Sequence, residues 1–119
     1  MRHWNLSGIE TPNGVRSPVV LHSQDGEDRV VLIELGAGQR LGEHQVKEAA
    51  LVLVLSGSVR VEAGDESVDA GASELFRFDP DERRSVLSDG GARVLLVLAP
   101  WPGAGHYRGS RGEAGVSAS

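Results

Sequence analysis

The chain has 119 residues, which is enough for one domain with its own core. Its formal net charge of −5 argues against the basic surface that nucleic-acid binding needs. The absence of cysteine excludes disulfides and thiolate metal sites, and no segment approaches the ~18 apolar residues of a membrane span. No signal-peptide pattern is found either. These features predict a cytoplasmic protein without nucleic-acid or membrane partners.

The predicted elements are short strands separated by turn residues. Apolar and β-branched runs predict strands at residues 17–22, 29–35, 44–55, 59–62, 66–69, 74–78, 83–88 and 93–99. Residues 44–55 also show helical spacing, but the run from Leu51 to Leu55 is apolar on every side and favours a strand. Gly57 is interpreted as the turn of a hairpin between this strand and the next.

Many short strands without an amphipathic helix predict a single all-β domain, either a sandwich or a barrel. Residues 1–27 are interpreted as an N-terminal lead-in and first strand, with residues 1–16 docking on the barrel. Residues 28–102 form the predicted barrel. Residues 103–119 are rich in glycine, serine and charge, so we expect a tail that is disordered from about residue 106.

The stretch from Gly38 to Gly57 resembles the first motif of the cupin family. That motif runs from a glycine through two metal-binding histidines and a glutamate to a second glycine. Gly38, His44 and Gly57 match it in register, whereas the second histidine position holds Val46 and the glutamate position holds Ala50. The resemblance covers about residues 28–100 and implies a cupin-type jelly-roll β-barrel.

The second cupin motif resembles the stretch that begins at Asp79 and Pro80. In this register Arg84 occupies the position of the third metal-binding histidine, and Ser88 occupies that of the asparagine. Strand alternation independently places Arg84, Val86 and Ser88 on one face. The resemblance therefore implies a barrel interior whose metal-binding positions are mostly replaced.

The four positions that bind metal in cupins hold His44, Val46, Ala50 and Arg84 here. One imidazole is too few donors for a transition metal, and a permanently protonated guanidinium repels a cation. We therefore predict no cofactor. If a divalent transition metal is nevertheless bound, its candidate ligands are His44, Glu48 and His22.

We expect His44 and Arg84 to face one another and bind a small anionic molecule in an otherwise apolar interior. The other candidate ligand-binding residues are Val46, Ala50, Val86 and Ser88. Simpler interpretations stay open. His44 fits an interior histidine bonded to a backbone carbonyl, and Arg84 fits an ion pair with a nearby carboxylate at the rim, from Asp79, Asp81 or Glu82.

Three functions follow from these residues. The first is a metal-independent binding or sensing module for a small molecule. The second is an enzyme, either a metal-free isomerase or cyclase with His44 as acid/base, or a metal-dependent oxygenase with a rearranged ligand set. The third is a non-catalytic dimeric scaffold. Leu51, Leu53 and Leu55 alternate with the inward residues and need cover, so we expect a homodimer.

Overall fold

The protein, described here from a computed structural model, is a strand-rich chain. The structure describes residues 1–11, 17–41 and 46–103. The elements of these residues are the 3-10 helix η1 (Leu6–Gly8) and the strands β1 (Ser17–Ser23), β2 (Glu27–Leu35), β3 (Gln39–Arg40), β4 (Ala49–Ala63), β5 (Glu66–Gly71), β6 (Leu75–Phe78), β7 (Arg84–Ser88) and β8 (Ala92–Trp101). The predicted all-β class is confirmed. Within the described ranges, no helix is long and apolar enough to span a bilayer.

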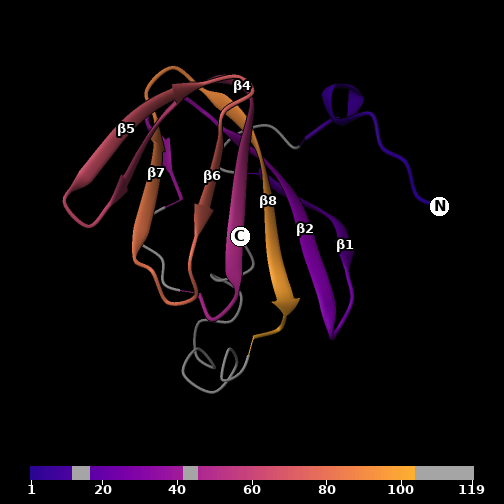
Figure 1. The fold of residues 1–119 in the computed structure, drawn as a ribbon. Coiled ribbons are helices and arrows are strands. Elements are labelled where there is room, and N and C mark those ends of the chain that lie inside the picture. Colours follow the sequence, from indigo (N-terminus) through magenta and orange to yellow (C-terminus); the bar gives the residue numbers. More distant parts are fainter. Residues whose placement is uncertain (12–16, 42–45, 104–119) are drawn as a thin grey trace.

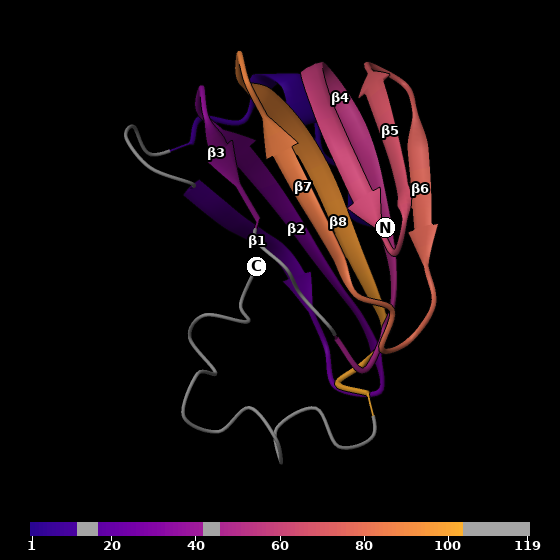
Figure 2. The ribbon, with the colours of Figure 1, turned by 90° about the vertical axis from the view of Figure 1, so that its left-hand side faces the viewer.

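The strands form two antiparallel sheets that share β4. In the first sheet, β4 pairs with β6 and β8, and β8 leads through β2 to β1 at the edge. In the second sheet, β4 pairs with β5 and β7, and β7 pairs with β3. Figure 1 shows β1, β2, β8 and β4 side by side. In the side view of Figure 2, β3 and β7 lie on one side of β4, and β5 and β6 lie on the other.

The core lies between the inward faces of these two sheets. Side chains alternate between the faces of a strand, so every second residue points into the core. β-Branched and leucine residues fill these positions, which suits a pleated surface. The inward residues include Val31, Ile33 and Leu35 of β2, Ala50, Val52, Val54, Val59 and Val61 of β4, Val86 of β7, and Val94, Leu96 and Leu98 of β8.

β4 runs unbroken through Gly57, so the predicted hairpin at this glycine is wrong. Up to Gly57 the strand pairs with β8, and from Ser58 onward it pairs with β5. Gly57 has a φ of 79°, and the register against β8 shifts between Val54 and Ser56. Gly57 is therefore the bend at which one strand passes from the first sheet to the second.

Other boundaries differ less from the prediction. The strand predicted from His44 begins at Ala49, and residues 42–45 lie outside the described residues. The short strand β3 was not predicted, because two residues are too few to show alternation. The predicted disorder of the tail also concerns residues outside the described part, since the described chain ends at residue 103.

The N-terminal lead-in contacts the outer face of the first sheet. Nη1 of Arg93 on β8 donates a hydrogen bond to the carbonyl of Leu6 at 2.7 Å. The same guanidinium donates from Nε to Glu34 of β2 at 2.9 Å. Thr11 also donates to Glu34, at 3.4 Å. One partly buried ion pair therefore connects the lead-in to two strands of the sheet.

We predict that Gly57→Ala destabilises the protein strongly. A Cβ at this position would lie 2.1 Å from the carbonyl oxygen of Gly91, and the positive φ disfavours any side chain. The expected loss in the free energy of unfolding is about 3 kcal/mol, measured by urea denaturation.

Gly64→Ala provides the matched control. Gly64 has a φ of 63°, but a Cβ there meets nothing within 4 Å. Its expected cost is only ~1 kcal/mol, because it carries the backbone strain without the clash. Equal losses for the two variants would contradict a steric role for Gly57.

Candidate functional site

Three side chains of β7 point into the barrel interior. Arg84, Val86 and Ser88 are only 4%, 1% and 0% exposed. Val86 pairs with Val61 and Arg84 pairs with Ala63 on β4, so the three share a face with inward residues of that strand. The shared face predicted from strand alternation is therefore present in the structure.

Arg84 is a buried cation that stacks on an aromatic ring. Its guanidinium carbon lies 5.4 Å from the ring centre of Phe78, at the end of β6. Within the described residues, Nη1 of Arg84 has no hydrogen-bond partner. Burial lowers the pKa of this guanidinium, and the carboxylates of Glu48 and Glu82 oppose the shift. Arg84 stays protonated at neutral pH, so the interior contains a permanent positive charge.

Glu48 is a second charged group in this region, and its carboxylate raises the pKa of Arg84. It lies in the bend just before β4, and its exposure is 0%. Its Oε2 accepts a hydrogen bond from the backbone N–H of Gly103 at 2.7 Å. A Cβ on Gly103 would lie 2.7 Å from the carbonyl oxygen of Lys47. The start of β4 and the segment after β8 are therefore packed closely around Glu48.

Two of the positions that the motif resemblance assigns to metal ligands are apolar here. Val46 is 5% exposed and Ala50 is 0% exposed, and both belong to the core cluster. Neither side chain can donate to a metal. His44 lies outside the described residues, so its predicted role stays a prediction. A cation at this place would have two apolar neighbours and a guanidinium, which do not fit a transition-metal centre.

The hydroxyl of Ser88 makes two hydrogen bonds to the backbone. It donates to the carbonyl of Ser58 at 2.7 Å and accepts from the N–H of Gly91 at 2.9 Å. These bonds tie β4 to the turn between β7 and β8, close to the bend at Gly57. Ser88 is therefore placed on the predicted face, but its hydrogen bonds stabilise the fold.

The carboxylates considered as rim partners of Arg84 interact with other groups. Asp79 pairs with Arg77, and Asp81 pairs with Lys47 at 2.9 Å. Glu82 accepts a hydrogen bond from the backbone N–H of Asp79 at 2.9 Å. In the part of the chain that the structure describes, none of the three forms an ion pair with Arg84.

His22 lies on the outer face of the first sheet. It pairs with Val30 of β2, which alternates with the core residues Val31 and Ile33. Glu27 and Asp28 lie close to it and complete a group of three potential metal ligands. His22 therefore does not join Arg84 and Glu48 in the interior.

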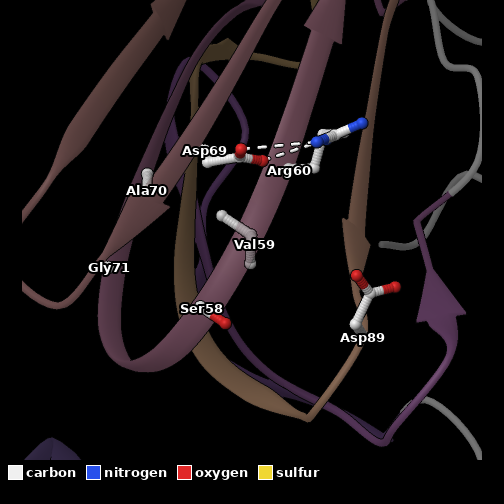
Figure 3. Close-up of a pocket in the computed structure, with 7 residues that line it drawn as sticks. All are labelled: Ser58, Val59, Arg60, Asp69, Ala70, Gly71 and Asp89. Atoms are coloured by element: carbon white, nitrogen blue, oxygen red, sulfur yellow. Dashed lines mark hydrogen bonds and ion pairs between the residues drawn. The ribbon is translucent and has the colours of Figure 1, made fainter.

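Figure 3 shows a hollow on the surface of the second sheet, with a volume of about 410 Å³. Arg60 and Asp69 line it and form an ion pair at 2.9 Å. Their hydrogen bond and opposite charges raise the pKa of Arg60 and lower the pKa of Asp69. Arg60 thus has a carboxylate partner at the surface, unlike Arg84 in the interior.

Sequence reasoning missed Phe78 as the ring beneath Arg84 and did not expect Glu48 to be buried. Both could have been found from alternation. Glu48 is two residues before Ala50 and shares its parity with the inward residues Val52 and Val54. Phe78 pairs directly with Ala50 across β4 and β6. A bend just before β4 interrupts the alternation, which hid the position of Glu48.

Comparison with known proteins gives a fold and no activity. No protein-family model matches the chain. No curated protein matches it either. Solved structures do match, with low sequence identity over most of both chains.

An RmlC-like cupin protein from Desulfovibrio desulfuricans is 19% identical and has a TM-score of 0.71, with 84% of this chain and 96% of that chain covered. An RmlC-like cupin from Shewanella frigidimarina is 16% identical with a TM-score of 0.71, covering 84% and 92%. A cupin superfamily protein from Desulfitobacterium hafniense is 17% identical with a TM-score of 0.71, covering 78% and 84%. The chain therefore has the cupin fold, the jelly-roll β-barrel that its motif resemblance implies.

Proposed function

We propose that this cupin-fold protein binds a small carboxylate-bearing molecule in the barrel interior, without a protein-bound metal there. The observation that supports the proposal most directly is the state of Arg84. Its side chain is only 4% exposed, yet its Nη1 has no hydrogen-bond partner among the described residues. A buried N–H group without a partner costs free energy, which an incoming acceptor would recover.

The surroundings of Arg84 favour a planar anion. Phe78 lies against the guanidinium, so new hydrogen bonds must form at the edge of the group. A carboxylate can accept two parallel hydrogen bonds at such an edge. Val46, Ala50 and Val86 supply apolar surface in the same core, and a pocket with apolar walls and few polar groups is typical of small-molecule sites.

The donor set supports a site without metal. Val46 and Ala50 have no donor atom, and Arg84 carries a permanent positive charge. His44 and the buried Glu48 would be the remaining donors near the cupin positions, whereas transition metals take three or four protein ligands. The proposed ligand, rather than a metal, therefore supplies the group that meets Arg84.

A second candidate function is a metal-free isomerase or cyclase. Glu48 favours it, because general acid/base catalysis by a histidine needs a positioned partner, and Glu48 is a buried carboxylate four residues from His44. In that case Arg84 holds the anionic substrate while His44 moves the proton. The predicted cytoplasmic location stays a prediction under either function.

We also propose that the protein forms a homodimer through the outer face of the first sheet. Leu75 of β6 is 60% exposed and Leu51 of β4 is 38% exposed. Leu53 pairs with Leu75 and Leu95, and Leu51 pairs with Val97, so the apolar side chains lie next to one another across three strands. A stripe of this kind is usually covered by another surface.

A screen of small carboxylic acids by thermal shift and calorimetry tests the binding proposal. A true ligand at 100-fold its dissociation constant should add ~2.7 kcal/mol to the free energy of unfolding. Arg84→Met should abolish this effect, because it keeps an apolar volume but removes the charge and the donors. Arg84→Lys should bind more weakly than wild type, since it loses the planar fork.

Arg60→Ala serves as the control, because it removes an exposed arginine from the surface pair with Asp69. This variant should keep the wild-type affinity. Circular dichroism must show that the Arg84 variants are folded. Unchanged affinity in folded Arg84→Met would contradict the proposal. If the protein converts a ligand, and if this activity is lost in both His44→Ala and Glu48→Gln, the result would instead support the isomerase or cyclase function.

Light scattering across a range of protein concentrations tests the dimer. Wild type should have twice the mass of one chain, and Leu75→Asp should weaken the dimer by about tenfold or more, because it buries a charge in the apolar stripe. Val68→Asp changes an exposed residue of β5 in the second sheet and should leave the dimer intact. A wild-type monomer at every concentration would rule out the dimer.

A further inference from the structure

Three potential metal ligands meet at the corner between β1 and β2. Nε2 of His22 lies 3.7 Å from Oε1 of Glu27 and 3.8 Å from Oδ1 of Asp28. One donor atom from each residue lies within 4.8 Å of the other two. The side chain of His22 is 17% exposed, whereas those of Glu27 and Asp28 are 62% and 37% exposed. The group is therefore accessible from solvent but anchored at the histidine.

A β-bulge brings His22 to this position. Val20 pairs with Val31, but His22 pairs with Val30, which leaves Leu21 as the extra residue of β1. In unbroken register, His22 would be opposite Arg29 and would lie on the other face. The bulge thus turns the imidazole to the outer face. Asp28 and Val30 of β2, two residues apart, lie on the same face.

The turn between the strands is held by the backbone. The N–H of Gln24 donates to the carbonyl of Asp28 at 3.1 Å, and the N–H of Glu27 donates to the carbonyl of Gln24 at 3.0 Å. The N–H of Gly26 donates to the carbonyl of Trp101 at the end of β8, at 2.6 Å. The two carboxylates therefore extend from the start of β2, next to a turn that is fixed to a neighbouring strand.

We propose that His22, Glu27 and Asp28 form a surface site for a divalent first-row transition metal such as Zn²⁺. At metal–ligand distances of ~2.1 Å, tetrahedral ligands lie about 3.4 Å apart. The separations of 3.7 and 3.8 Å from Nε2 exceed this by only a few tenths of an ångström. Rotation of the exposed Glu27 side chain closes the difference, and water completes the coordination. Imidazole with carboxylates suits zinc, nickel and copper better than calcium or magnesium.

Arg2 competes with the metal for the histidine. Its Nη1 forms a hydrogen bond with Nδ1 of His22. A guanidinium can only donate, so Nδ1 is the acceptor and the proton of the neutral ring is on Nε2. Metal binding needs the lone pair of Nε2, which requires the ring proton to move to Nδ1 through solvent. That shift removes the acceptor of Arg2 and releases its side chain, which is exposed.

The site is independent of the interior. His22 lies on the outer face, whereas Arg84 and Glu48 are buried inside the barrel. A surface metal therefore neither needs nor excludes the proposed carboxylate ligand. The metal would link β1, an edge strand, to the start of β2, so binding should raise the unfolding temperature.

Calorimetric titration of the full chain, purified without a histidine tag, with Zn²⁺ tests the site. One equivalent should bind per chain, and Co²⁺ should produce the visible absorption of a bound ion. His22→Ala and the near-isosteric Asp28→Asn should each weaken binding by about tenfold or more. Arg2→Ala should tighten binding by about fivefold, since it removes the competing hydrogen bond. If the three residues had only a structural role, Arg2→Ala would not bind Zn²⁺ more tightly than wild type.

His3→Ala is the matched control, because it removes a histidine from elsewhere in the chain, and it should bind like wild type. His44→Ala distinguishes the surface site from a metal in the interior. The proposal is overturned if wild type does not bind Zn²⁺, or if folded His22→Ala and Asp28→Asn keep the wild-type affinity. It is also overturned if Arg2→Ala binds no more tightly. Binding lost only in His44→Ala would overturn it and would also contradict the metal-free interior.

Discussion

A permanent positive charge inside an apolar barrel is the constraint on which the site depends. Arg84 is almost fully buried, and burial opposes its charged form. A guanidinium cannot give up its proton at neutral pH, so the surrounding structure must stabilise the charge. The ring of Phe78 and the carboxylates of Glu48 and Glu82 do so, with Glu48 contributing more than Glu82. The interior is therefore arranged around a buried organic cation.

β4 brings these groups together because it belongs to both sheets. Glu48 immediately precedes the strand, Ala50 pairs with Phe78 near its start, and Ala63 pairs with Arg84 at its end. The bend at Gly57 lets the strand change sheets without ending. The same bend that shapes the barrel thus sets which side chains face the interior from the two sheets.

Most of the fold could be predicted from alternation and turn residues. Alternation placed Arg84, Val86 and Ser88 on one face, as the structure has them. Gly57 was misread because a glycine at a bend within a strand has the same sequence pattern as a glycine in a hairpin turn. The pairing of Gly57 with Ala92, far along the chain, distinguishes the two, and no local pattern contains it. The group around His22 depends likewise on a one-residue bulge that local sequence does not mark.

The charge balance between Glu48 and Arg84 is the central claim, and a double-mutant cycle in the free energy of unfolding tests it most directly. Glu48→Gln, Arg84→Met and the double variant would be compared by urea denaturation. The account predicts that each single change leaves one buried charge uncompensated, so the double variant should be less destabilised than the sum by about 1–3 kcal/mol. Additive losses would show that the two charges do not stabilise one another and would contradict the account.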